Sequence, residues 1–139
     1  MFWKDCCSLN RPPGDACRSF RDAGFCLAID DFGTGYSSLA YLQRLPAQIV
    51  KIDQTFIRDL TIAEGPDFEL AETMISLAHK LGYRVVAEGV ETAEAAAILK
   101  ELGCEEAQGF WFARPMEADR FATWLSERRK SARPVLCAA

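Results

Sequence analysis

The sequence lacks the features that would place it among membrane proteins, zinc proteins or nucleic-acid-binding proteins. Only one of its 139 residues is a histidine and no Cys-x-x-Cys pair occurs, so the common zinc-site spacings are excluded. No apolar run approaches the roughly 18 residues that span a bilayer, and the start, Met1–Cys7, contains no apolar core of a secretory signal. With 20 acidic and 16 basic side chains, the net charge is −4, and the basic face that nucleic-acid binding requires is missing.

Six cysteines are present, and we expect reduced thiols. Four of them lie within the first 26 residues, but the rest of the chain has the composition of a cytosolic protein, with 50% apolar and 26% charged residues. Cys104 is most simply a packing residue. The composition and the length predict one globular domain with no membrane segment and no nucleic-acid partner, located in the cytoplasm.

Apolar strands and amphipathic helices alternate along the chain after residue 14. The predicted strands are 25–29, 49–53, 84–87 and 107–112. The predicted helices are 15–23, 37–44, 67–81, 92–102 and 118–128, and Asp67 is expected to cap the third of them. This order is typical of parallel strands joined by helical crossovers. Because a complete (β/α) barrel needs about 250 residues, we predict an α/β fold that is a partial, half TIM-type barrel of four βα units.

The periodicity also predicts the domain boundaries. Residues 1–14 have no period and contain a Pro-Pro-Gly turn signal, residues 15–126 contain the four repeated units, and residues 127–139 form a loose tail.

Polar side chains gather at the carboxyl ends of the predicted strands. From the first strand to the fourth they are Asp30 and Asp31, Lys51 and Asp53, Glu88 and Glu91, and Gln108. Parallel α/β proteins bind ligands at this end of the sheet. We therefore expect these side chains to converge on one rim.

The residue types on this rim agree with one chemistry. The carboxylates of Asp30, Asp31, Asp53 and Glu88 are oxygen ligands that suit Mg²⁺ or Mn²⁺. Beside Lys51 they suit phosphoryl chemistry, in which metal neutralises phosphate charge and the lysine holds a water or the developing charge. Two plainer interpretations stay open: an Asp-Asp pair is commonly a turn or a helix cap, and Asp53 could form a structural salt bridge with Lys51.

Four segments, in order, carry a specific resemblance. They are Ala28–Leu39 (AIDDFGTGYSSL), Val50–Ile57 (VKIDQTFI), Val85–Thr92 (VVAEGVET) and Gln108–Pro115 (QGFWFARP). These segments resemble the signature loop, the Lys-Ile-Asp strand, the Ala-Glu-Gly-Val-Glu strand and the last strand of EAL domains, the bacterial cyclic di-GMP phosphodiesterases. The resemblance covers about residues 16–125.

The resemblance implies hydrolysis of cyclic di-GMP to linear pGpG with Mg²⁺ or Mn²⁺ as cofactor. It implies that Asp30 binds the first metal, that Asp31 serves a second, and that Asp53 supports the metal site. Glu88 would be the general base, and Lys51 would contact the hydrolytic water.

Further residues receive supporting roles from the resemblance. Gln108 would line the site, and Glu91 would hold the loop that follows the two aspartates in place. The residues of this loop are Phe32, Gly33, Thr34 and Gly35.

The first half of the EAL domain has no counterpart in this sequence. In the family that half supplies three metal ligands, namely the glutamate of Glu-Ala-Leu, an asparagine and a further glutamate, and the tripeptide Glu-Ala-Leu is absent here. We therefore expect an amino-terminally truncated domain with weak metal binding and weak or lost cyclic di-GMP binding. Three functions stay open: an enzyme whose chemistry is intact in this chain or completed by a partner, an inactive remnant that binds nucleotide or protein, and a structural half-barrel.

A half-barrel also has two open sheet edges, which favour self-association. The inward faces of its strands, with Val86 and Phe110 as examples, are expected to be exposed. A homo-oligomer is the prediction; the alternative is a monomer in which residues 1–14 cover one edge.

Overall fold

Four parallel strands form a single sheet in the computed structural model, which describes residues 13–34, 39–61 and 63–130. The strands lie side by side in chain order: β1 (Ala28–Phe32), β2 (Ile49–Ile52), β3 (Arg84–Ala87) and β4 (Glu106–Ala107). Each neighbouring pair is parallel. The predicted α/β half-barrel is thus confirmed, because this is half the number of strands in a complete TIM barrel. The predictions for residues 1–12, for Gly35 and for residues 131–139 lie outside the described residues.

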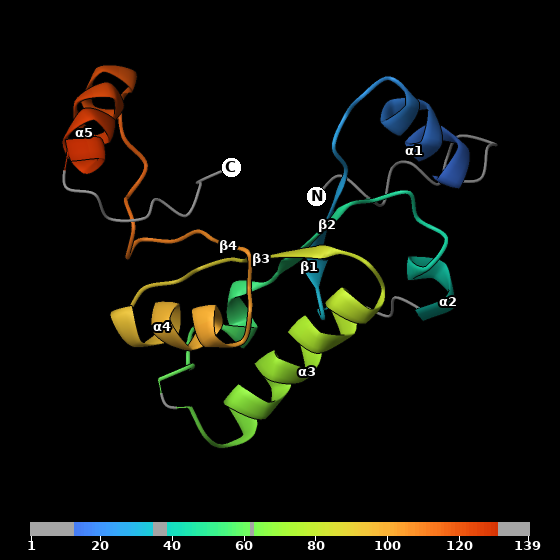
Figure 1. Ribbon diagram of the computed structural model, residues 1–139, viewed down its shortest axis with the longest axis horizontal. Helices are drawn as coiled ribbons and strands as arrows, with labels where there is room; N and C mark the ends of the chain where they lie inside the picture. The colour runs from blue at the N-terminus through green and yellow to red at the C-terminus, as the bar shows by residue number, and fades with distance from the viewer. Residues whose placement is uncertain (1–12, 35–38, 62, 131–139) are drawn as a thin grey trace.

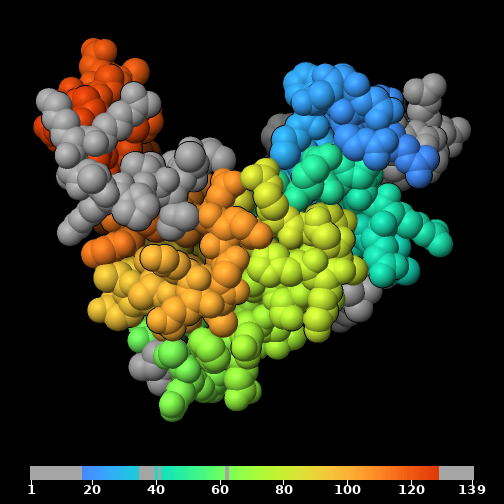
Figure 2. All heavy atoms as spheres, in the orientation of Figure 1, coloured from blue at the N-terminus to red at the C-terminus, as the bar shows by residue number. Residues whose placement is uncertain are grey.

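The described residues form five α-helices and one short 3₁₀ helix. They are α1 (Pro13–Asp22), α2 (Leu39–Leu42), η2 (Gln54–Phe56), α3 (Pro66–Lys80), α4 (Ala93–Glu101) and α5 (Ala118–Lys130). Helices α3 and α4 cover one face of the sheet, and α1 and α5 project on the other side (Figure 1). Figure 2 shows that the molecule is hollowed between α1 and α5. Among the described helices, none is long and apolar enough to cross a membrane.

The apolar core lies between the sheet and the two covering helices. Val50 and Ile52 of β2 are fully buried, together with Val85 of β3. Side chains alternate along a strand, so Val50 and Ile52 share the helix-facing side and Lys51 points to the opposite face. The stripe predicted on α3 supplies the other side of this core, with Ala78 fully buried. Burial of one large aliphatic side chain contributes about 1.5–3 kcal/mol.

Both outer strands differ from the prediction. β1 begins at Ala28, three residues later than predicted; Phe25 is exposed, and the two aspartates lie within the strand. β4 is much shorter than 107–112 because the chain turns after Gln108, and the backbone at Gly109 passes against that of Val90. An added Cβ at Gly109 would lie 2.1 Å from the carbonyl oxygen of Val90.

Two further details of the prediction are wrong. Helix α3 begins at Pro66 after Gly65 and has no side-chain cap, so Asp67 does not cap it. Val86 is 5% exposed, and the inner face of the sheet is therefore less open at this position than the sequence suggested. Phe110, by contrast, is 49% exposed, as expected.

The cysteines among the described residues are free thiols. These are Cys17, Cys26 and Cys104. Cys104 packs against the core, and its Sγ donates a hydrogen bond to the carbonyl oxygen of Glu106 at 3.1 Å. Burial raises the pKa of Cys104 to about 11, so this thiol stays protonated at neutral pH. The packing role predicted for Cys104 is confirmed.

Candidate functional site

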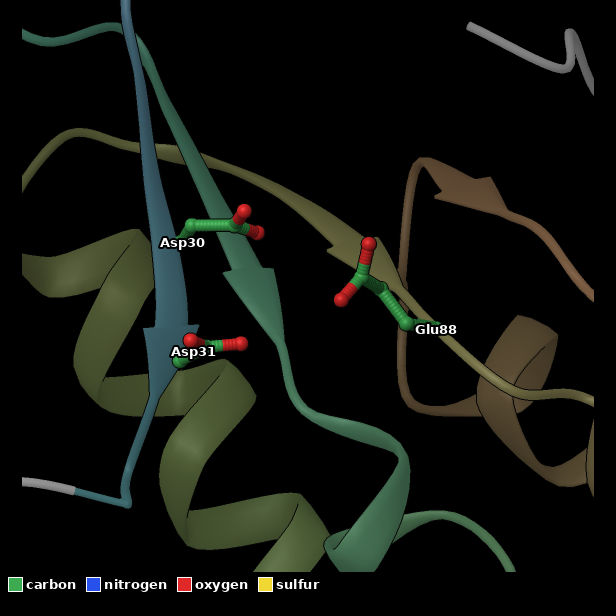
Figure 3. A group of neighbouring side chains, drawn as sticks. All are labelled: Asp30, Asp31 and Glu88. Carbon is green, nitrogen blue, oxygen red and sulfur yellow. The ribbon is translucent and has the colours of Figure 1, made fainter. Parts of the chain in front are cut away.

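A bulge in β1 turns two consecutive aspartates towards the same side of the sheet. The register with β2 shifts between Ile29 and Phe32, and Asp31 has a φ of 51°, in the left-handed region. In a regular strand, consecutive side chains point to opposite faces. Here Ile29 and Phe32 are both buried, and Asp30 and Asp31 are exposed between them. The extra residue of the bulge therefore lets both carboxylates reach one rim (Figure 3).

The turn after Asp31 holds this unusual backbone in place. The amide and the hydroxyl of Thr34 both donate to the carbonyl oxygen of Asp31, at 3.2 and 2.9 Å. Gly33 has a φ of 101°, and an added Cβ would lie 2.6 Å from both the Met74 methyl and the Phe56 ring. A non-glycine residue in the left-handed region costs about 1–3 kcal/mol. Only glycine fits at position 33, and these contacts offset the cost at Asp31.

Three carboxylates converge on the rim. Asp30, Asp31 and Glu88 each offer an oxygen atom, and these atoms lie within 4.8 Å of one another (Figure 3). Glu88 follows β3, and its amide donates to the carbonyl oxygen of Ile52 at 3.0 Å. The cluster therefore reaches across β2, the strand between the two that supply its ligands. Three carboxylate oxygens this close together repel one another and fit a divalent cation such as Mg²⁺ or Mn²⁺.

Lys51 of β2 lies between these carboxylates. Its Nζ donates to Asp30 Oδ1 at 2.9 Å and forms an ion pair with Glu88. Partial burial lowers the pKa of Lys51, but the hydrogen bonds and negative charges of Glu88 and Asp30 outweigh this, and the pKa is raised overall. Lys51 is therefore a charged donor at neutral pH. The proposed salt bridge to Asp53 is not the contact that Lys51 makes.

Gln108 orients the third carboxylate. Its Nε2 donates to Glu88 Oε1 at 2.7 Å, the same oxygen that pairs with Lys51. The backbone of Gln108 is fixed on both sides, because its amide donates to Ala87 and its carbonyl oxygen accepts from Val90. The structure therefore places Gln108 beside Glu88, and its role in lining the site stays a prediction.

Asp53 lies outside the carboxylate cluster found among the described residues. Its Oδ1 accepts hydrogen bonds from the hydroxyl of Thr55 at 2.6 Å and from the amide of Thr55 at 2.8 Å, which caps helix η2. These two bonds lower the pKa of Asp53, so its carboxylate stays ionised in mild acid. Asp53 is therefore a helix cap, a role that the sequence suggested for the Asp30-Asp31 pair and not for Asp53.

Glu91 lines a pocket of about 510 Å³ that the sequence did not reveal. Two cation–π contacts lie on its wall: the Arg114 guanidinium is 4.4 Å from the Phe110 ring centre, and that of Arg128 is 4.9 Å from the Trp124 ring centre. The only sequence signal was the density of aromatic residues after the last strand. The role predicted for Glu91 concerns a loop that continues into residues 35–38, outside the described part of the chain, and stays a prediction.

Comparison with protein families gives a match to the EAL domain over residues 6–115. The match starts before residue 15, where the sequence placed the domain boundary. Among curated proteins, cyclic di-GMP phosphodiesterase NbdA of Pseudomonas aeruginosa is 47% identical over 116 residues, which cover 84% of this chain and 15% of NbdA. This chain thus spans less than a fifth of the length of that relative.

Solved structures of EAL domains have the same fold. The EAL domain of Mycobacterium smegmatis DcpA is 38% identical with a TM-score of 0.74, over 82% of this chain and 51% of that one. BlrP1 of Klebsiella pneumoniae, solved with manganese and cyclic di-GMP, is 40% identical with a TM-score of 0.64, over 73% of this chain and 26% of that one. The half-barrel, its rim of carboxylates and these matches together show that the chain belongs to the EAL domain family.

Proposed function

We propose that this chain forms one half of a metal-dependent site that hydrolyses cyclic di-GMP in bacterial signalling. The observation that supports this most is the convergence of Asp30, Asp31 and Glu88 beside Lys51. The names of NbdA and of the BlrP1 complex point to the same substrate. The free thiols of the described cysteines fit a cytoplasmic location.

Mg²⁺ or Mn²⁺ would be held by Asp30 and Asp31, with Glu88 beside them. Such a cation makes a water molecule more acidic and neutralises the charge of a phosphate group. Hard divalent cations take about six oxygen ligands, so three carboxylates leave about half of the positions to water or to another part of a complete domain. We therefore propose weak metal binding by the chain alone.

The protein groups divide the remaining chemistry between them. Glu88 accepts the proton of the attacking water, and its orientation is fixed by Lys51 and Gln108. The ammonium of Lys51 stabilises negative charge on the phosphate. Asp53 supports the site from the end of β2. The water oxygen attaches to phosphorus, one P–O bond of the ring breaks, and the released ribose oxygen takes up a proton, so that the product is linear pGpG.

A catalytically inactive module that binds nucleotide or protein is the second candidate. The observation that favours it is the ligand count, because the cluster among the described residues holds only three carboxylates.

A chimeric domain separates the two candidates. In it, this chain replaces the half of the DcpA EAL domain that it matches, so the other half completes the barrel. We expect Mn²⁺-dependent formation of pGpG by the chimera and its loss in Glu88→Gln, while Glu94→Gln on the exposed side of α4 retains activity. A folded chimera without turnover would support the inactive module.

Lys51 competes with a bound metal for the same carboxylates. Replacement of its positive charge in Lys51→Met is expected to tighten Mn²⁺ binding about tenfold, because a charge a few ångströms from a divalent cation repels it even in water. Lys80→Met, on the exposed side of α3, is the matched control and should leave the affinity unchanged. Calorimetric titration measures both. Weaker binding by Lys51→Met would mean that the lysine organises the carboxylates.

We also propose that the chain self-associates through the two outer strands of its sheet, β1 and β4, each of which pairs with only one strand among the described residues. Exposed aromatic side chains lie near both: Phe20 and Phe25 precede β1, and Phe110 and Trp111 follow β4. Unpaired strand edges next to exposed apolar groups favour association.

Light scattering over a dilution series tests the self-association. We expect a dimer or a larger species that shifts towards monomer in Phe25→Lys. The matched control is Leu70→Lys, because Leu70 is also exposed but lies on α3, away from both edges. A compact monomer at every concentration would contradict the proposal.

A further inference from the structure

We propose that Asp53 is a positioning residue: it fixes the bulge at Asp30 and Asp31 through helix η2 and the Phe56 ring, and does not bind the metal itself. This inference rests on the proposed metal site. In this inference, a residue at the end of β2 determines the backbone conformation of the bulge in β1.

The first step is the cap. Both hydrogen bonds from Thr55 end on the same oxygen of Asp53, at 2.6 and 2.8 Å, and the Phe56 amide donates to the Asp53 carbonyl oxygen at 3.1 Å. The backbone of Asp53 is extended, and the chain turns into η2 directly after it. Asp53 thus sets the direction in which the three residues of η2 leave the strand.

The second step is the contact between Phe56 and the loop. Phe56 is partly buried against the core. Its ring lies so close to Gly33 that an added Cβ there would be 2.6 Å from ring atom Cε2 and 2.9 Å from Cζ. A movement of η2 therefore moves the Phe56 ring, against which Gly33 packs.

The third step leads from the loop to the carboxylates. Gly33 lies between Phe32, which is anchored in the core, and Thr34, which donates two hydrogen bonds to the Asp31 carbonyl oxygen. These contacts hold Asp31 at a positive φ, which a residue with a side chain adopts at a cost. Without the contact between the Phe56 ring and Gly33, the bulge can relax to a regular strand. One of the two aspartates then turns away from the rim.

Two substitutions distinguish positioning from metal binding. In Asp53→Asn the side-chain oxygen can still accept both bonds from Thr55, but the negative charge is lost. In Asp53→Ala the cap and the charge are both lost. A metal ligand needs the charge, whereas a positioning residue needs only the cap.

The experiment measures free Mn²⁺ by electron paramagnetic resonance and the hydrogen exchange of the Thr34 amide by NMR. We expect Asp53→Asn to bind Mn²⁺ within about twofold of the unaltered chain, with unchanged exchange, and Asp53→Ala to bind about tenfold more weakly, with faster exchange. Equal losses in the two variants, or normal binding in both, would overturn the inference.

Two further variants keep the outcome interpretable. Thr55→Val removes one of the two bonds at an exposed position, and should show an intermediate exchange rate even if Asp53→Ala does not fold. Asp30→Asn tests the proposed function itself. If Mn²⁺ binding does not depend on Asp30, the proposed metal site is wrong. In that case the exchange of the Thr34 amide still reports on positioning.

Discussion

The purified chain by itself is expected to hydrolyse cyclic di-GMP at least about a thousandfold more slowly than a complete EAL domain, in Mg²⁺ or in Mn²⁺. The rim brings together three carboxylates and one lysine. A divalent cation held by about half of its preferred ligands is neither fixed in position nor fully effective in neutralising phosphate charge. Formation of pGpG, followed by chromatography over hours, measures the rate.

Contaminating enzyme from the expression host is the main source of error, and Asp30→Ala controls for it. Any turnover that survives this substitution does not come from the chain. Robust metal-dependent turnover that disappears in Asp30→Ala would contradict the prediction, and would mean that the half-barrel is a sufficient catalyst.

Gly109→Ala is expected to destabilise the fold by about 3–4 kcal/mol. The added Cβ would lie 2.1 Å from the carbonyl oxygen and 2.3 Å from the nitrogen of Val90, and both are backbone atoms. The Val90 amide donates to Gln108 and its carbonyl oxygen accepts from Trp111, so Val90 cannot move away without loss of these hydrogen bonds. The substitution therefore separates the fourth strand from the third.

Urea denaturation of Gly82→Ala provides the matched comparison. Gly82 also has a positive φ, but an added Cβ there has no atom within 4 Å, so only backbone strain of about 1 kcal/mol is expected. Equal midpoints for the two variants would show that the contact with Val90 can relax.

The sequence predicted the sheet and the convergence of the site because both follow from simple periods. Val50 and Ile52 alternate with Lys51, and that alternation places the lysine on the face opposite the helices. The sequence placed Asp30 just after the first strand, and it lies within β1 instead, but its position beside Lys51 and Glu88 is still consistent with the order of the strands. Such features depend on local pattern and on the topology of parallel sheets.

The bulge in β1 could not be predicted from these patterns. A strict period of two places Asp31 on the helix-facing side, and only the contacts of the following turn with Phe56 and Met74 reveal why it does not go there. These partners are far away in the sequence. The helix cap at Asp53 could not be predicted for a different reason. A carboxylate at the end of a strand can equally well bind a metal, form a salt bridge or cap a helix.

The aromatic pocket depends on tertiary structure in the same way. Trp124 and Arg128 of α5 line the same pocket as Phe110 and Arg114, which follow the short fourth strand. The sequence predicted a longer strand through Phe112, which would carry these side chains apart. Strand length was set by the close approach at Gly109, which no pattern of apolar residues indicates.

Asp30 and Asp31, with Glu88 beside them, are proposed to hold a divalent metal ion. Calorimetric titration of the chain with Mn²⁺ tests this proposal most directly, with Asp31→Asn as the variant and Asp67→Asn, an exposed aspartate at the start of α3, as the control. We expect weak Mn²⁺ binding that is lost in Asp31→Asn and kept in Asp67→Asn. Tight Mn²⁺ binding that is unaffected by Asp31→Asn would contradict it.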